Sequence, residues 1–257
     1  FSAVLDSFKV EAEKRGYDIT FINHNISGRS MTYLEHCHYR SVDGVVIACV
    51  NFYDPQVVEL VNSDVPVVTI DHVFNNRMAV LSDNVAGLKA LVKQAWACGH
   101  RRIAFIHGEK TSVTENRIAG FYQACEELGL EIPEEYVRDG VYHDVERCAE
   151  ETRALLALPQ RPTCIIFPDD FSALGGYNAL AEAGLSIPDD ISVMGYDGIY
   201  LSRVVNPSLV TYQQNTAALG QTAADKLIEL IEHPRVTLPE QIRVSGRLLS
   251  GRSVRSL

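Results

Sequence analysis

Short runs of consecutive apolar residues, rich in valine and isoleucine, recur along the chain and narrow its possible folds more than any other feature. The runs are DITFIN (18–23), GVVIACV (44–50), PVVTI (66–70), RIAFIHG (102–108), TCIIFP (163–168) and ISVMGY (191–196). Such runs are typical of strands that are buried on both faces, as in a parallel sheet covered by helices. We therefore predict parallel strands at these positions.

Segments with helical periodicity lie between the runs. Apolar residues recur at helical spacing in 84–98, 115–128 and 215–232, and a glycine follows each of the first two segments. Alternating strands and helices predict a doubly wound α/β fold. With 257 residues and this many units, two similar lobes are favoured over one very wide sheet.

The charge balance and the lengths of the apolar runs exclude some classes of partner. The formal net charge is −10, from 33 acidic and 23 basic residues, which argues against direct binding of this chain to a phosphate backbone. No apolar run approaches the roughly 20 residues that a membrane-spanning helix needs. We therefore expect no membrane partner.

The six cysteines form no CxxC pair. Cys49 and Cys164 lie in apolar runs and Cys125 lies on an apolar helical face, so we interpret the cysteines as small buried hydrophobic residues of a cytoplasmic protein. The EHCH segment (35–38) lacks a second cluster of ligands, and we predict no metal site.

Polar and aromatic side chains directly follow several of the predicted strands. They are Phe52, Asp71, Asp169, Asp170, Phe171 and Asp197. Ligands of open parallel sheets bind beyond the carboxyl ends of the strands, so these positions are expected to converge on a ligand site. Taken alone, an aspartate at such a junction more often caps the following helix than binds a ligand. Asp170 is the best candidate for a residue whose only role is to cap a helix.

Arg117 stands on the inward face of the predicted helix 115–128. Asp169 and Asp197 could accept its hydrogen bonds, either as a purely internal ion pair or as part of a site that binds the hydroxyls of a polyol. Phe52, Tyr142 and Phe171 could cover the apolar faces of a sugar ring, although aromatic residues of this kind are more often part of a core.

Motifs of catalysis and cofactor binding are absent from the sequence. No GxGxxG follows a strand, and neither GxxxxGK[ST] nor GxSxG occurs. We therefore predict that the protein is not an enzyme and has no cofactor.

Four long segments together resemble the effector-binding core of the lac-repressor/galactose-repressor (LacI/GalR) family of bacterial transcription regulators. They are GHRRIAFIHG (99–108), ENRIAGFYQA (115–124), the segment 161–198 and the segment 206–231. The resemblance runs from Phe1 to about residue 253. It implies the fold of periplasmic sugar-binding proteins, type I, with two doubly wound lobes joined by three crossovers. The implied lobes are 1–81 plus 216–243 and 84–212 plus 247–257.

The resemblance also implies a function and a set of site residues. The family's ligand positions fall on Asp71, Arg117, Tyr142, Asp169, Asp197 and Gln214, and Leu81 matches a position that lines the cleft between the lobes. Asp169 departs from the pattern, which usually has asparagine there. The implied protein is a homodimeric repressor whose effector, a sugar, binds in the cleft and controls operator binding allosterically.

The family places further segments ahead of FSAVLDSFKVEAEKRG (1–16): a first strand of the N-terminal lobe and, before it, a helix-turn-helix that binds operator DNA. Neither is in the printed sequence, so we expect these residues to be part of a longer chain. Two alternatives remain open at this point, namely the solute-binding protein of a sugar transporter and an α/β enzyme.

Overall fold

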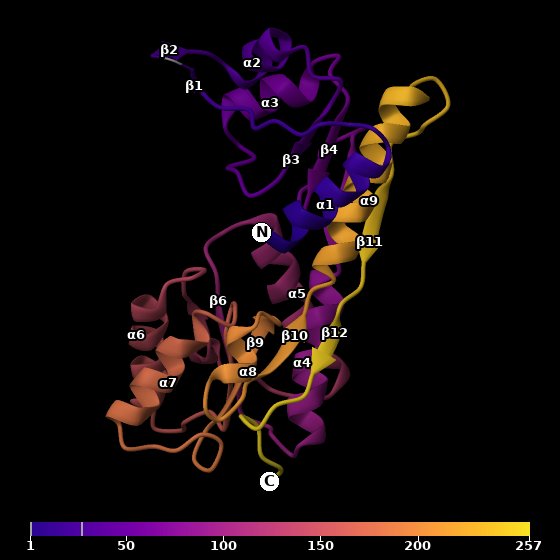
Figure 1. The fold of residues 1–257 in the computed structure, drawn as a ribbon. Coiled ribbons are helices and arrows are strands. Elements are labelled where there is room, and N and C mark those ends of the chain that lie inside the picture. The colour runs from indigo at the N-terminus through magenta and orange to yellow at the C-terminus, as the bar shows by residue number, and fades with distance from the viewer. Residues whose placement is uncertain (1, 27) are drawn as a thin grey trace. The chain divides into compact units, whose positions relative to one another are not determined.

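The computed structural model describes residues 2–26 and 28–257, and the chain divides into two compact units (Figure 1). Unit 1 comprises Phe1–Ser82 and Asn215–Val244, and unit 2 comprises Asp83–Gln214 and Ser245–Leu257. The chain therefore passes between the units three times, at 82–83, 214–215 and 244–245. None of the described helices is both long enough and apolar enough to cross a membrane.

Unit 1 is built on a four-stranded parallel sheet. Its strands lie in the order β11 (Gln241–Val244), β5 (Met78–Ser82), β4 (Val67–Ile70) and β3 (Val45–Ile47). Its helices are α1 (Ser2–Lys14), α2 (Tyr33–Arg40), α3 (Pro55–Asn62) and α9 (Thr216–Glu232), and a two-stranded ribbon is formed by β1 (Asn25–Ile26) and β2 (Arg29–Ser30).

The alternation of side chains along β4 explains why helices cover both faces of this sheet. Val68 and Ile70 pack in one apolar cluster with Leu219 and Leu227 of α9. Val67 points the other way, into a cluster that includes Val57, Leu60 and Val61 of α3. Consecutive apolar residues are needed here because neither face of the strand meets water.

Unit 2 contains a six-stranded sheet in which only β12 runs antiparallel to its neighbour. The order is β12 (Arg247–Leu249), β10 (Val210–Gln213), β9 (Ser192–Asp197), β8 (Cys164–Ile166), β6 (Ile103–His107) and β7 (Val137–Asp139). The connecting helices are α4 (Asn84–Ala97), α5 (Ser112–Glu127), α6 (Val145–Leu156), α7 (Ala173–Glu182) and α8 (Leu201–Val204), with a 3-10 turn, η1, at Glu134–Tyr136.

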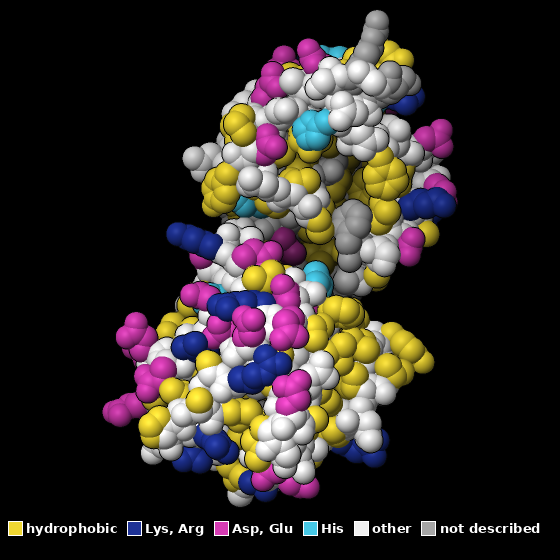
Figure 2. Space-filling view, turned by 90° about the vertical axis from the view of Figure 1, so that its left-hand side faces the viewer, with side chains coloured by type: hydrophobic (Ala, Val, Ile, Leu, Met, Phe, Trp, Pro, Cys, Tyr) yellow, Lys and Arg dark blue, Asp and Glu magenta, His cyan; other side chains and the backbone are white. Residues whose placement is uncertain are grey.

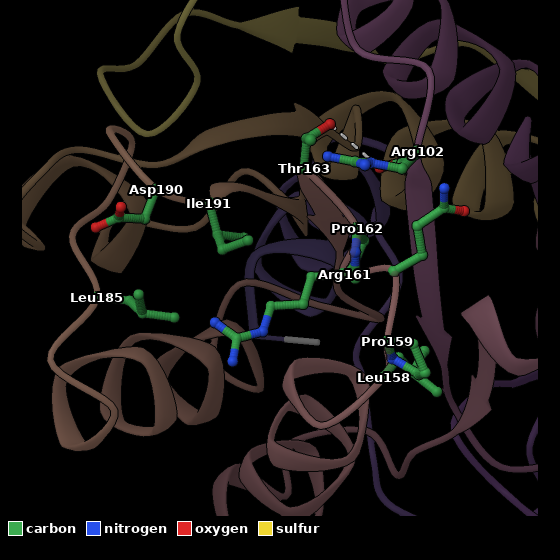
Figure 3. A pocket seen from close by; sticks show the side chains of 10 residues that line it. Arg102, Leu158, Pro159, Arg161, Pro162, Thr163, Leu185, Asp190 and Ile191 are labelled. Atoms are coloured by element: carbon green, nitrogen blue, oxygen red, sulfur yellow. Dashed lines mark hydrogen bonds between the residues drawn. The ribbon is translucent and has the colours of Figure 1, made fainter.

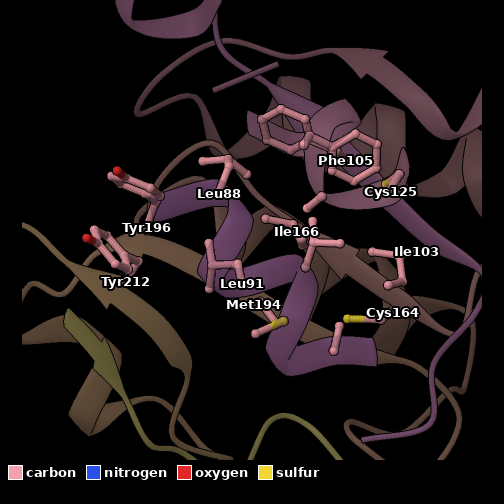
Figure 4. Packing of buried hydrophobic residues seen from close by; sticks show 14 of the residues in the cluster. Leu88, Leu91, Ile103, Phe105, Cys125, Cys164, Ile166, Met194, Tyr196 and Tyr212 are labelled. Atoms are coloured by element: carbon pink, nitrogen blue, oxygen red, sulfur yellow. The ribbon is translucent and has the colours of Figure 1, made fainter. Parts of the chain in front are cut away.

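The larger of the two clusters in unit 2 lies between its sheet and helices α4 and α5. Leu88 and Leu91 of α4 pack with Phe105, Ile166 and Met194 of the strands, as Figure 4 shows. A second cluster joins the opposite face of the sheet to α6 and α7. This three-layer arrangement confirms the predicted doubly wound fold and brings the carboxyl ends of β6, β8 and β9 to one edge of the sheet.

Most of the predicted elements are confirmed. The helical segments 84–98, 115–128 and 215–232 correspond to α4, α5 and α9, although α5 begins earlier, at Ser112. Five of the apolar runs contain β3, β4, β6, β8 and β9. Five other strands of the two main sheets, β5, β7, β10, β11 and β12, were not predicted, because most of them are short or half-exposed and lack a long apolar run.

The strand predicted at 18–23 is wrong. Residues 18–23 have no regular secondary structure, and the nearest strand, β1, begins only at Asn25. Ile19 and Phe21 are exposed, the latter by 62%. β-branched and aromatic residues favour a strand only where a neighbouring strand takes up the backbone hydrogen bonds, and no pairing to this segment occurs in the described sheets.

The prediction for the cysteines is correct for four of them. Cys37, Cys125, Cys148 and Cys164 are buried, and all six thiols are free. Cys49 is exposed, contrary to the prediction, because the chain leaves the sheet after Ile47 and Cys49 adopts a left-handed backbone conformation with φ of 55°. Cys98, which follows α4, is partly exposed.

Candidate functional site

Arg117 is the centre of a buried polar network in unit 2. Its side chain is 4% exposed although it carries a charge, and helix α5 directs it toward the carboxyl ends of the strands. Nε donates to Oδ1 of Asn84 at 2.9 Å, and a terminal nitrogen donates to the Pro168 carbonyl at 2.7 Å. The guanidinium carbon lies 3.6 Å from the centroid of the Tyr196 ring. A guanidinium removed from water needs such partners, and these hold its plane in one orientation.

Asp197 ends β9 next to this guanidinium. Its Oδ1 lies 3.8 Å from Arg117 and accepts a hydrogen bond from Nε2 of Gln214 at 2.5 Å. Burial raises the pKa of Asp197, and the positive charge of Arg117 and the amide of Gln214 oppose that shift. The residue has φ of 98°, a conformation that aspartate rarely adopts and that surrounding structure must hold in place. This strain at the end of a strand is typical of a functional site.

Asp169 lies within the same unit but is occupied by local partners. Its Oδ1 accepts from the backbone N–H of Ser172 at 2.8 Å, and its Oδ2 accepts from the backbone N–H of His143 at 2.9 Å and from the Ser172 hydroxyl at 2.7 Å. The His143 ring approaches Oδ1 at 3.4 Å and is itself 70% exposed. Asp169 therefore positions the segment that carries His143, and it is the imidazole that faces solvent.

Asp170 does not act as the predicted helix cap, because Ser172 is the N-cap residue of α7 and makes no side-chain capping bond. Its carboxylate is 1% exposed and accepts from the Thr211 hydroxyl at 2.5 Å and from the backbone N–H of Ile199 at 2.8 Å. These bonds connect the end of β8 to β10 and to the loop after β9. Burial raises the pKa of Asp170 to about 7, and the nearby charge of Asp197 adds to the shift while the Thr211 hydroxyl opposes it.

The two aromatic residues predicted for this unit differ in their surroundings. The Tyr142 ring lies 5.5 Å from the Arg117 guanidinium, and its hydroxyl is 2.9 Å from that of Thr114. Phe171 is 42% exposed and contacts the His143 ring edge-on, at a centroid distance of 6.5 Å. Tyr142 thus belongs to the arginine network, whereas Phe171 presents an open apolar face.

Unit 1 carries its predicted residues at the carboxyl ends of β4 and β5. Asp71 has φ of 59°, and its Oδ1 accepts from the backbone N–H of Ser82 at 2.6 Å. The Asp71 carboxylate thereby joins the ends of two adjacent strands. Leu81 is a buried residue of β5.

A cluster of rings forms at the same edge of unit 1. The Phe52 and His72 rings are stacked at 4.3 Å with an interplanar angle of 6°. Phe74 and Tyr53 contact the His72 ring edge-on, at 4.7 and 5.9 Å. Burial lowers the pKa of His72, so the ring favours its neutral form and can act as part of an apolar surface.

Sequence reasoning missed three residues of the unit 2 network, namely Asn84, Tyr196 and His143. Asn84 follows a short strand that was not predicted, so its place at a strand-to-helix junction went unnoticed. Tyr196 is the last residue of the run 191–196, which predicts only a strand, yet its hydroxyl lies 3.4 Å from Oδ1 of Asn84. His143 directly follows the predicted site residue Tyr142 in the sequence, and this adjacency is the signal that could have identified it.

The combined chemistry of the unit 2 residues suits a neutral polar ligand. The network offers a fixed guanidinium, an amide and carboxylate oxygens within a few ångströms of each other, so it can both donate to and accept from hydroxyl groups. Tyr142 and Phe171 add ring faces.

Comparison with known proteins identifies the family. Residues 92–254 match the model of the periplasmic binding protein-like domain. The HTH-type transcriptional repressor PurR of Haemophilus influenzae is 30% identical over 264 residues, which cover 100% of this chain and 78% of the repressor. The chain belongs to the LacI/GalR family.

Solved structures agree with this assignment. A LacI family transcriptional regulator from Enterococcus faecium, determined with bound ribose, is 26% identical with a TM-score of 0.85 and covers 100% of this chain and 94% of its own. A regulatory protein of the LacI family from Chloroflexus aggregans is 28% identical with a TM-score of 0.83, over 98% and 91% of the two chains. The chain is therefore the effector-binding core of a LacI-family transcriptional regulator, and the alternative of a transporter's solute-binding protein is disfavoured.

Proposed function

We propose that this LacI-family core binds a sugar, and that the polar network of unit 2 recognises the hydroxyls of that sugar. The observation that carries the proposal is the arrangement of Arg117, Asp197 and Gln214, in which one carboxylate oxygen is shared by a guanidinium and an amide. A hydroxyl group can accept from the amide or guanidinium and donate to the carboxylate, so a polyol matches the network without bringing a charge of its own. The ribose-bound regulator from Enterococcus faecium supports this class of effector.

The remaining predicted site residues are assigned to the same effector as part of the proposal. Asp71, Leu81 and Phe52 belong to unit 1, and Tyr142, Asp169 and Phe171 belong to unit 2. Support differs among them: Phe171 presents an open ring, whereas the oxygens of Asp169 already accept from Ser172 and His143. We therefore assign to Asp169 the role of positioning His143, whose exposed imidazole is a further candidate contact.

We also propose the organisation and partners that the family implies. The lobes are residues 1–81 plus 216–243 and 84–212 plus 247–257, which the two compact units support. The effector changes the affinity of a homodimer for operator DNA, with a coupling of about 1–3 kcal/mol as is usual for allosteric proteins. DNA binding is assigned to a helix-turn-helix outside these residues, the regulator acts in the cytoplasm, and the core catalyses no reaction.

The experiment begins with a search for the effector by thermal shift. Monosaccharides, disaccharides and nucleosides are screened at 1–10 mM as a rough range, because a ligand that binds only the folded state raises its stability by RT ln(1 + [L]/Kd), about 2.7 kcal/mol at a hundredfold excess over Kd. A sugar should give the shift. A shift with nucleosides alone would contradict the proposed effector class.

Two adjacent glutamines then provide a matched pair of variants for calorimetry. Gln214→Leu removes the amide that donates to Asp197 and should weaken sugar binding by roughly tenfold or more. Gln213→Leu is the control, because the Gln213 amide contacts Gly198 and Arg247 instead. Equal affinity in the two variants would refute the assigned site. Arg117→Ala is less informative, because Arg117 also holds Asn84 and the Pro168 carbonyl.

A further inference from the structure

A hollow of about 540 Å³ lies in unit 2 at the amino ends of the strands, away from the residues assigned to the effector. Arg102 precedes β6, Thr163 precedes β8 and Ile191 precedes β9, and all three line the hollow (Figure 3). At about 3.3 Å per residue, the five residues of β6 separate Arg102 from the opposite edge of the sheet by roughly 17 Å. The hollow is therefore distinct from the edge of the sheet that carries the residues assigned to the effector.

Among the residues that the structure describes, two guanidinium groups in this hollow have no carboxylate partner. Within residues 2–26 and 28–257, neither the Arg102 nor the Arg161 side chain forms an ion pair or a side-chain hydrogen bond. The arginines of the face formed by α6 and α7 behave differently, since Arg147 pairs with Glu151, and Arg153 with Glu182.

Figure 2 shows basic and acidic side chains interspersed on that face. In a chain with 33 acidic and 23 basic residues, carboxylates outnumber the cations that they could pair with. The guanidinium groups of Arg102 and Arg161, which have no carboxylate partner within the described residues, are therefore available to an anion from outside the chain.

The walls of the hollow suit a small organic molecule. Arg161 stands between Gln160 and Pro162, and Pro159 precedes Gln160; both prolines line the hollow and restrict the backbone that presents the arginine. In Figure 3 the Arg161 side chain extends into the hollow. Leu158 and Ile191 add apolar surface, which can pack against a carbon skeleton.

Asp190 also lines the hollow and would repel an anion. Its Oδ2 accepts from the backbone N–H of Ser186 at 2.7 Å, and the carboxylate points away from Arg161 in Figure 3. Two guanidinium groups against one carboxylate leave the hollow with a net positive charge.

We propose that this hollow is a second small-molecule site, which binds a phosphomonoester such as the phosphate ester of a short polyol. The planar fork of a guanidinium matches the oxygens of a phosphate, and the second guanidinium adds positive charge to the same hollow. The volume falls within the range of about 300–1,000 Å³ typical of small-ligand sites. The side-chain amide of Gln160 is available to the alcohol groups of the ester, whereas the Thr163 hydroxyl already bonds to His100 and to the Arg102 carbonyl.

Calorimetry on the purified protein tests the proposal with sn-glycerol 3-phosphate as the probe and glycerol as its uncharged counterpart. Glycerol 3-phosphate should bind, glycerol should not, and the affinity should fall as salt rises from 20 to 200 mM, as a rough range, because the hollow is open to solvent. Succinate distinguishes a phosphomonoester site from a site for any dianion. Binding of succinate as tight as that of the phosphate ester, or no binding of the ester, would overturn the proposal.

Substitutions of the two arginines test whether glycerol 3-phosphate binds in this hollow. Arg161→Gln and Arg102→Gln should each weaken binding of glycerol 3-phosphate by roughly tenfold or more, as expected when a charged hydrogen-bond donor is removed. Both side chains are exposed, so the melting temperature without ligand should stay close to that of the wild type. Arg235→Gln is the matched control, since Arg235 is an exposed arginine of unit 1. Equal losses in the control and the two variants would show that only net charge matters, and would also overturn the proposal.

Discussion

Replacing Asp170 by asparagine should change how the stability of unit 2 depends on pH. Burial raises the pKa of this carboxyl from its ordinary value of 3.8 to about 7. The folded state therefore binds the proton more tightly than the unfolded state. The stability that Asp170 contributes is greatest below about pH 4, and it is lost as the pH rises through the interval up to about 7.

The size of this effect follows from the width of the interval. Each pH unit between about 4 and 7 should reduce the free energy of unfolding by about 1.4 kcal/mol, which sums to about 4 kcal/mol above pH 7. Asp170→Asn keeps the shape of the side chain without the charge. Its amide can accept from the N–H of Ile199 and donate to the hydroxyl of Thr211, which then becomes the acceptor.

Urea unfolding at pH 4, 5, 6, 7 and 8 measures the effect, at constant ionic strength. The only tryptophan, Trp96, lies in α4, so its fluorescence reports on unit 2. Wild type and Asp170→Asn should be similar in stability near pH 4, and the variant should be the more stable protein by several kcal/mol at pH 8. Asp189→Asn is the control, because it makes the same change at an exposed residue. A difference between wild type and Asp170→Asn that is constant with pH would refute this reasoning.

Three further predictions concern stability and use the same fluorescence assay. Arg117→Met should cost about 3 kcal/mol, because the Pro168 carbonyl loses a buried donor; a loss under about 1 kcal/mol would contradict this. Gly195→Ala should lower the free energy of unfolding by about 1–3 kcal/mol, because a Cβ there would clash with the Asp170 carboxylate. Stability equal to that of the wild type would contradict this and show that the backbone can shift to relieve the clash. Burial lowers the pKa of His100 below 6.5, so stability should fall as the pH drops below 6.5, and His100→Gln should remove that part of the acid sensitivity; an unchanged pH profile would count against it.

Local patterns in the sequence predicted much of the fold, because the spacing of apolar residues reflects which faces of a strand or helix are buried. Consecutive apolar residues marked β3, β4, β6, β8 and β9, and helical periodicity marked α4, α5 and α9. The run at 18–23 shows the limit of such patterns. It has the composition of a strand, but a strand also needs a neighbour for its backbone hydrogen bonds, and composition does not supply one.

The candidate site was predictable in part for a topological reason. Parallel strands bring their carboxyl ends to one edge, so the residues after β8 and β9 could be expected to lie near each other and near Arg117. The roles of the two adjacent aspartates could not be assigned in this way. Asp169 binds Ser172 and His143, whereas Asp170 binds Thr211 and Ile199.

The sequence by itself therefore determined the class of fold, the position of most helices and central strands, and the family. Only the tertiary structure decided which partner each polar side chain binds: that Asn84 and Tyr196 hold Arg117, that Asp170 is an interior carboxyl, and that Arg102 and Arg161 share one hollow. The physical reason is one of range. Burial periodicity is local along the chain, whereas a hydrogen bond or an ion pair depends on atoms within about 3–4 Å that come from distant parts of the chain.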